Sequence, residues 1–286
     1  MLAQQIVNGI LLGSMYALLA ISYTLVLGVL NLLNLAQGEI LTASALIAYT
    51  LLCHSGNIAL ALAGAVVAGV ILSIIIEYVC FRLPRGDTQV VTTIAMGMIL
   101  QNVYTKLWGS ESLKFPSLPM NWRVQLGSVT LNAAQILLIA LTVILVVGLA
   151  YLIERTRFGR QMRAMAGNPR AAQVSGVSLR LTTIRTFALS GLVAGVTGVM
   201  AGMVFTSITA FIGGNVGEKA MVAMVIGGAG SAFGAGVAGL LLGVLEIFSV
   251  TKLGAEYREI IIFPLLLLFL WLRPSGLFHR GVVDRV

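Results

Sequence analysis

Long runs without a charged side chain are the feature that most constrains this chain. Residues 1–38 contain no charged residue, and residues 134–153 form 20 uncharged residues in succession. About 20 apolar residues in a helix cross the ~30 Å hydrocarbon core of a bilayer, and a helix in lipid satisfies its own backbone hydrogen bonds. Only 10% of the residues are charged, against about 25% in soluble domains. We therefore predict an all-α integral membrane protein.

We predict a single transmembrane domain over residues 1–286, with about eight or nine spans that include broken and half-length helices. The polar stretch 31–39 lies between two apolar runs. It fits either a short turn at the cytoplasmic interface or a helix break buried within the bundle. The glycine-rich stretch 227–236 disfavours a straight helix. It predicts a half-length helix inward, a glycine turn, and a helix outward to about Val250.

Three further features bear on how the spans are arranged. One helix face carries glycines at four positions, which predicts a close contact between helices: 191, 195, 198 and 202. Glu218 and Lys219 interrupt two apolar runs, and we assign Lys219 to the outer side. The last apolar run, residues 260–272, is short and places the C-terminus in the cytoplasm. The N-terminus is then outside if the number of spans is nine.

The segment 154–185 carries seven arginines and one acidic residue, Glu154. Each charge costs several kcal/mol in lipid, so we expect this segment to be a loop in water. Short loops rich in Arg and Lys stay on the cytoplasmic side. The segments assigned to the inside hold twelve Lys and Arg residues, against six outside. The charge distribution therefore predicts a cytoplasmic loop in the middle of the chain.

The pattern within this loop predicts two short helices separated by a break. Asn168 is placed to cap a helix with Pro169 in its first turn, and that helix should end at Gly176. Its apolar residues would pack against a soluble partner, with arginines around the contact: Ala171, Ala172 and Val174. The alternative is a solvated loop that only fixes the topology, and the charge alone does not separate the two.

Other functions have less support in the sequence. The net charge of +8 follows the positive-inside pattern, so we expect no nucleic acid as a partner. Paired carboxylates, metal-ligand clusters and the motifs H-E-x-x-H, Walker A and G-x-S-x-G are absent, so we expect no catalytic residue and no metal. Glu39, Glu77 and Glu246 could be proton sites of an ion-coupled secondary transporter. We favour positions near the interfaces or local pairing for these acids. Cys53 and Cys80 are interpreted as free thiols.

Four motifs in the same order resemble the permease subunits of bacterial ABC importers of the branched-chain amino-acid and urea class. They are NGILLGSMYALLA (8–20), NLAQGE (34–39), FGRQMRAMAGNPRAAQVSGV (158–177) and MVIGGAGSAFGAGVAGLLLGVLE (224–246). The chain departs from the family pattern in the second motif, where Leu35 replaces the usual Phe and Gln37 the usual His. These departures bear on the preference for leucine-like substrates.

The resemblance implies a multi-pass protein of the bacterial inner membrane that forms part of a translocation path. Its partners would be a second permease subunit (as a heterodimer), two cytoplasmic ATPase subunits and a periplasmic binding protein. ATP would be bound by the ATPases, so no cofactor is expected on this chain. The implied coupling residues are Arg160, Arg163, Asn168, Ala171, Ala172 and Gly176. Candidates for the path are Asn8, Ser14, Asn34, Gln37, Gly38, Glu39, Gly227 and Gly230. The expected substrates are branched-chain or other hydrophobic amino acids, with urea or short amides as the alternative.

Overall fold

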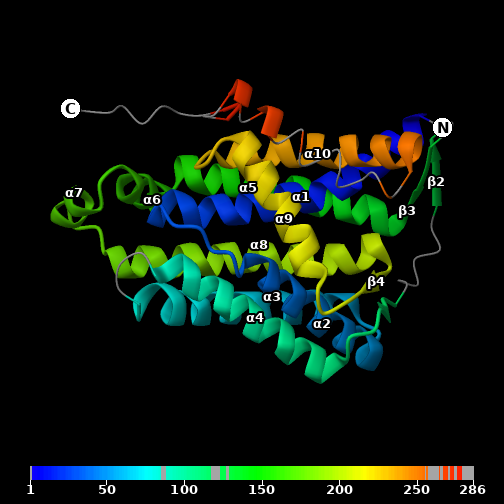
Figure 1. Ribbon diagram of the computed structural model, residues 1–286, viewed down its shortest axis with the longest axis horizontal. Helices are drawn as coiled ribbons and strands as arrows, with labels where there is room; N and C mark the ends of the chain where they lie inside the picture. The colour runs from blue at the N-terminus through cyan, green and yellow to red at the C-terminus, as the bar shows by residue number, and fades with distance from the viewer. Residues whose placement is uncertain are drawn as a thin grey trace.

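The computed structural model describes residues 2–84, 88–116, 123–126, 129–254 and 256, with a few residues between 264 and 278. It is an all-α bundle in which most long helices run along the long axis (Figure 1). The fold class predicted from the apolar runs is confirmed. The helices are α1 (Leu2–Leu30), α2 (Gln37–Ser55), α3 (Ile58–Ile76) with the π-helical turn η1 (Glu77–Arg82), α4 (Thr88–Trp108), α5 (Ala133–Arg155), α6 (Arg157–Gly167), α7 (Pro169–Val174), α8 (Leu179–Phe205), α9 (Ile212–Gly227) and α10 (Ala232–Leu253).

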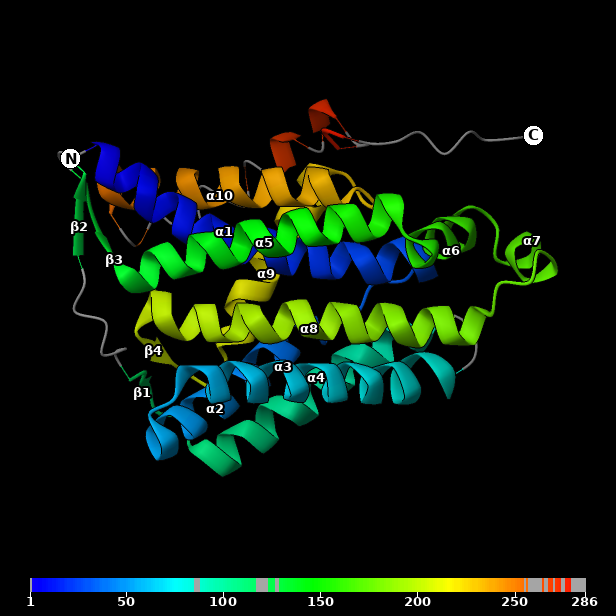
Figure 2. The same cartoon turned by 180° about the vertical axis from the view of Figure 1, so that it is seen from behind.

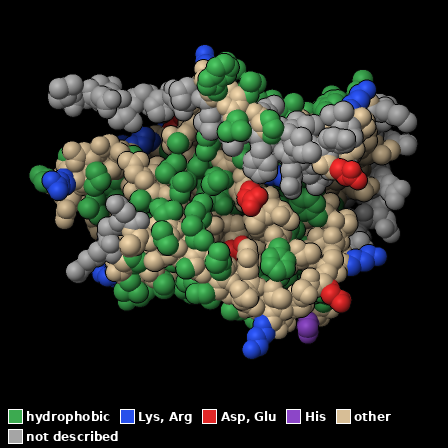
Figure 3. Space-filling model, viewed as in Figure 1, with side chains coloured by type: hydrophobic (Ala, Val, Ile, Leu, Met, Phe, Trp, Pro, Cys, Tyr) green, Lys and Arg blue, Asp and Glu red, His purple; other side chains and the backbone are tan. Residues whose placement is uncertain are grey.

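Five helices in the described part of the chain are long and apolar enough to cross a membrane: α1, α3 with η1, α5, α8 and α10. Most residues of α1 and α8 are buried, whereas only 22% of the α3 span and 17% of the α5 span are buried. Hydrophobic side chains also cover the middle of one face, with basic side chains towards its edges (Figure 3). This distribution suits a core of α1 and α8 with lipid around it. The expected total of eight or nine spans and the cytoplasmic C-terminus stay predictions, and most of the span expected at 260–272 lies outside the described residues.

Small residues set the spacing between α1 and α10. A methyl group on Gly9 would lie 2.7 Å from the Cα of Val244, and one on Gly13 would lie 2.7 Å from the carbonyl oxygen of Leu240. Gly239 and Gly243 of α10 face the same contact from the other side. Neither helix could approach the other this closely with larger residues at these positions.

The glycine face predicted in α8 is confirmed as a contact surface. Gly191 and Gly195 lie against α3, at Gly69 and Ala65, and Gly198 lies against Leu41 of α2. Gly202, the fourth glycine, lies against the ring of Phe115. Since α8 residue numbers rise as α3 numbers fall along this contact, the two helices are antiparallel.

The polar stretch after α1 is a break inside the bundle and not a turn at its surface. Gln37, the first residue of α2, donates hydrogen bonds to Ser22 Oγ (2.6 Å) and Ser190 Oγ (2.9 Å). Ser22 lies about 12 Å before the end of α1, at a rise of ~1.5 Å per residue, and Ser190 lies near the middle of α8. The chain therefore folds back into the bundle before α2 begins.

The second predicted break is also confirmed, with one correction. The half-length helix α9 runs steeply across the bundle (Figures 1 and 2). It ends at Gly227, and α10 starts after a turn in which Gly228 and Gly230 have positive φ. Lys219, however, is a buried residue within α9 and not part of an outer interruption. The pattern misled because Glu218 beside it is exposed, while Lys219 faces inward.

The two ends of the bundle differ in structure. At one end lie the start of α1, a hairpin of β2 (Arg123–Leu126) and β3 (Val129–Asn132), and the pair β1 (Leu113–Lys114) and β4 (Ser207–Ile208). These strands were not predicted. At the other end, α6 and α7 project from the bundle (Figure 2). The basic loop is shorter than the predicted 154–185, because α5 continues to Arg155 and α8 begins at Leu179.

Candidate functional site

A cavity of about 250 Å³ lies where the break after α1 meets the first half of α9. Its lining comes from α1, the break after it, α2, α4 and α9: Tyr23, Leu35, Gly38, Glu39, Ile94, Gly97, Met98, Gln101, Gly213, Gly214, Gly217, Glu218 and Met221. Broken helices that meet at mid-depth line the substrate site in many transporters. The cavity is therefore the candidate binding site of this fold.

The contact between α2 and α9 that forms one wall of the cavity depends on glycine. A methyl group on Gly213 would collide with the backbone oxygen of Gly38 and with the hydroxyl of Thr42. The Gly213 N–H donates a hydrogen bond to Thr42 Oγ1 at 3.0 Å. This bond satisfies one of the unpaired N–H groups in the first turn of α9. The first turn of the half-length helix is thus anchored on α2.

Glu39 is the buried charged residue of the cavity, with 4% of its surface exposed. Its Oε1 accepts a hydrogen bond from Gln101 Nε2 of α4 at 2.8 Å. Its backbone oxygen accepts one from the hydroxyl of Tyr104, also of α4, at 3.1 Å. These two bonds fix the start of α2 against α4. Glu39 was predicted to lie near an interface or to pair locally, and the structure gives it a neutral partner in mid-bundle.

Asn34 and Gln37 lie beside the cavity but do not line it. Asn34 Nδ2 donates to Gln37 Oε1 at 2.9 Å, and both side chains are buried. Gln37 in turn reaches Ser22 and Ser190, as described above. This network holds the break between α1 and α8. Of the two departures noted in the second motif, Leu35 faces the cavity and Gln37 does not.

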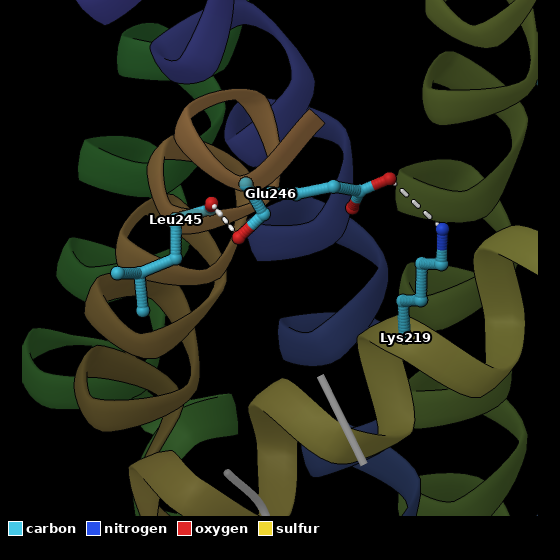
Figure 4. A network of polar contacts seen from close by, with 4 residues as sticks. Lys219, Leu245 and Glu246 are labelled. Carbon is cyan, nitrogen blue, oxygen red and sulfur yellow. Dashed lines mark hydrogen bonds and ion pairs between the residues drawn. The ribbon is translucent and has the colours of Figure 1, made fainter. Parts of the chain in front are cut away.

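A buried ion pair connects α9 to α10 (Figure 4). Lys219 Nζ lies 2.9 Å from Glu246 Oε1, and the carboxylate side chain is fully buried. The same ammonium group lies 5.9 Å from the centroid of the Tyr16 ring on α1, within the range of a cation–π contact. Glu246 was predicted to lie near an interface or to pair locally, and the structure pairs it with a lysine of the neighbouring helix.

Four of the predicted path residues lie away from this cavity. Asn8 is exposed near the strand end of the bundle, and Ser14 donates a hydrogen bond to Ile10 of its own helix. Gly227 packs against Gly234 at the end of α9, and Gly230 is an exposed turn residue. The structure therefore groups only the residues from 34 to 39 around the candidate site.

The sequence pattern did not single out the other side of the site. Tyr23, Gly213 and Gly217 fall within uncharged runs, where nothing marks them as lining residues. Gln101 could have been singled out as a candidate lining residue, because it is a polar residue within an apolar run. Its neighbour Asn102 is polar too, yet it is hydrogen-bonded to Met98 of its own helix. Polarity alone could not separate the two.

The structure assigns different roles to the predicted coupling residues. Arg163 donates hydrogen bonds to the backbone oxygens of Ile153 and Glu154 at the end of α5, and Ala172 is buried within the chain. The expectation that Ala172 faces a partner is wrong, because α7 turns this residue towards its own bundle. Five coupling candidates are exposed: Arg160, Arg163, Asn168, Ala171 and Gly176.

The predicted start and end of α7 are confirmed. Asn168 caps the helix by accepting a hydrogen bond from the N–H of Ala171 at 3.1 Å, with Pro169 in the first turn. Gly176 has a φ of 84° and lies just past the end. Val174, the last residue of α7, is 91% exposed.

Potential metal ligands and cysteines are scattered over the described residues. No group of three or more His, Cys, Asp or Glu side chains that could hold a metal is found among them. Cys53 and Cys80 are free thiols, the first exposed and the second buried. The polar groups that the fold concentrates are those of a membrane transport protein, with broken helices around a mid-bundle cavity.

Comparisons with known proteins identify the family. The family described as branched-chain amino acid transport system / permease component matches residues 5–270, and the chain belongs to it. The high-affinity branched-chain amino acid transport system permease protein BraD of Pseudomonas aeruginosa is 35% identical over 99% of this chain and 97% of its own length. The corresponding protein LivH of Escherichia coli K12 is 32% identical over the same shares. The chain is a multi-pass inner-membrane protein.

A solved structure gives independent support for the fold. The chain is similar to PsaBC from Streptococcus pneumoniae in complex with Fab, with a TM-score of 0.52 and 16% identity. The match covers 96% of this chain and 92% of that one. At this identity the likeness concerns the fold alone. It agrees with a permease-type arrangement of helices.

Proposed function

We propose that this chain is the transmembrane subunit of an ABC importer that carries branched-chain amino acids across the inner membrane. The observation that carries the proposal is the match to permease relatives over nearly the whole chain. The architecture supports it, since broken helices surround a mid-bundle cavity. ATP is bound and hydrolysed on separate subunits, whose motion reaches this chain through contacts at its surface.

The cavity beside Glu39 is part of the path for the substrate. Its apolar lining suits an aliphatic side chain: Leu35, Ile94, Met98 and Met221. Urea and short amides would leave most of this surface without a contact, which favours a branched-chain substrate over them. An ion-coupled secondary transporter is not favoured, because Glu246 is already paired with Lys219.

The chain works in an assembly with a second permease subunit, two ATPases and a periplasmic binding protein. The segment formed by α6 and α7 is the part that contacts an ATPase. Arg160, Arg170 and Val174 are exposed on it, so they offer an apolar tip with positive charge around it. Arg163 ties the segment to the end of α5, and Ala172 is buried within the chain.

The test is ATP-driven uptake in proteoliposomes. Liposomes that contain the permease pair, both ATPases and the binding protein should accumulate labelled leucine when ATP is present on the ATPase side. Liposomes with this chain alone should not. Uptake of leucine by the isolated chain, or uptake of urea and not leucine by the full assembly, would contradict the proposal.

A further inference from the structure

One carboxylate oxygen in the cavity is buried without a hydrogen-bond partner. Glu39 is 4% exposed, and while its Oε1 is bonded to Gln101, its Oε2 has no partner in the part of the chain that the structure describes. A buried polar atom is normally paired, because leaving it unpaired carries a free-energy cost. Unpaired groups of this kind are a mark of sites that complete their bonding with a ligand.

The charges around this oxygen define which kind of ligand could supply its missing hydrogen-bond donor. The described residues that line the cavity include two carboxylates, Glu39 and Glu218, and no Lys or Arg side chain. Lys219 is next to Glu218 in the sequence, but its ammonium group is held by Glu246 (Figure 4). A cation is the ligand that offsets the cost of a buried carboxylate. The cavity therefore selects for positive charge.

The rest of the lining limits the shape of the ligand. Ile94, Met98 and Met221 add apolar surface next to the carboxylate, and Gly213 and Gly217 place bare backbone there. The volume of about 250 Å³ suits a small molecule and not a peptide. An ammonium group that bonds Glu39 would leave its aliphatic part against the methionine and isoleucine side chains.

We propose that Glu39 Oε2 is the binding group for the ammonium of the transported molecule, so that the cavity takes compact aliphatic amines and amino acids. The inference rests on the proposed function and specifies how that site selects its ligand. Gln101 is a positioning residue, because its hydrogen bond to Oε1 holds the carboxylate in place while Oε2 stays unpaired. The substrate's carboxylate is not recognised in this cavity, since no described lining residue is basic.

The test is ligand-induced stabilisation of the purified assembly, without the binding protein. Leucine, 3-methylbutylamine and 4-methylpentanoate share an aliphatic chain, but only the first two carry an ammonium group. Millimolar leucine and 3-methylbutylamine should raise the Tm of the wild-type assembly, and 4-methylpentanoate should not. E39Q should weaken the effect of both amines by about tenfold or more in half-maximal concentration, as expected for loss of a charged hydrogen bond.

Matched controls separate binding from folding. E39Q keeps the size of the side chain and an oxygen that can accept from Gln101, so the Tm of the assembly without ligand should stay close to that of the wild type. E111Q makes the same change at an exposed carboxylate outside the cavity, and it should respond to the amines as the wild type does. Equal stabilisation by all three compounds, or equal responses of E39Q and the wild type, would overturn the inference.

The proposed function and the ammonium site can be tested separately. If the wild-type assembly with its binding protein accumulates no leucine, the proposed function is wrong. If it accumulates leucine and E39Q shows the same KM and the same response to 3-methylbutylamine, the function stands and the ammonium site is wrong. A rise in KM for leucine in E39Q, with a wild-type Tm in the absence of ligand, supports both.

Discussion

Lys219 and Glu246 form an ion pair within a membrane bundle, where an isolated charge is costly. We expect K219M to destabilise the protein by about 3 kcal/mol, because it leaves the buried carboxylate without its cation. The measurement is the unfolding transition of the purified chain in detergent. The pair also joins the half-length helix α9 to α10, so transport should fall together with stability.

The double variant K219M/E246L is the control for this prediction. Replacement of a whole buried ion pair by apolar residues is often neutral, so this variant should recover most of the lost stability. If K219M is as stable as the wild type, or if the double variant is no better than K219M, the ion pair does not stabilise the fold.

The glycine at the α2–α9 contact gives a second prediction at the residue scale. G213A places a methyl group against the backbone oxygen of Gly38 and the hydroxyl of Thr42, and overpacking of this kind costs about 1–3 kcal/mol. A methyl group on Gly148 in α5 would meet no neighbouring atom within 4 Å. G148A should therefore be neutral or slightly stabilising, since Ala is the better helix former. Unfolding of both variants under the same conditions is the measurement, and equal effects would contradict the packing argument.

The residue contacts show where sequence reasoning reaches its limit. It could be predicted that Glu246 has a partner, because a buried acid requires one. The identity of the partner could not be predicted, because Lys219 is 27 residues away and its neighbour Glu218 is exposed. A pair of neighbouring charges looks like a surface feature until the helix that carries them is placed in the bundle.

At the scale of elements, the positions of both helix breaks could be predicted, but the contact that forms the cavity could not. Polar residues and glycines mark residues 31–39 and 227–236 in the sequence, because such residues disfavour an apolar span. The contact that forms the cavity lies elsewhere, between Gly38 and Gly213. Gly213 belongs to the start of α9, and nothing in an uncharged run distinguishes the glycine that begins a helix from one that packs within it.

The short helix α7 gives the prediction at this scale. V174E changes a side chain that is 91% exposed, so the fold should be retained while the ATPase subunit binds at least tenfold more weakly, as expected when an apolar contact residue is lost. Co-purification of the ATPase measures binding, and the Tm of the permease measures the fold.

A172E tests the difference between the two faces of α7. Ala172 is buried against the chain itself, so its replacement by Glu should lower the Tm of the permease. If V174E lowers the Tm and leaves ATPase binding intact, the exposed tip is not the contact. If A172E has a wild-type Tm, the orientation of α7 is wrong.

For the whole molecule, charge and packing lead to the same two-ended arrangement. The positive-inside pattern assigns α6 and α7 to the cytoplasm, and α3 and α8 pack antiparallel, so that the end of α8 lies with the start of α3. The start of α1 lies at that same far end, because Gln4 is hydrogen-bonded to Thr130 of the hairpin. The side of each end could be predicted from charge. The hairpin was not predicted, although residues 123–132 alternate apolar and polar side chains around a Gly-Ser pair.

Cysteine labelling tests this arrangement in the membrane. Cys53 is exposed near the end of α2, at the end of the bundle opposite α6 and α7, and Cys80 is buried. A membrane-impermeant maleimide should therefore label the wild-type chain at Cys53 in spheroplasts. The variant C53S/A164C moves the single accessible thiol to α6, where Ala164 is exposed. It should resist the reagent in spheroplasts and react in inverted vesicles, with C53S alone unlabelled in both. Labelling of C53S/A164C from the outside would place the basic segment on the wrong side of the membrane and remove the ATPase contact from α7.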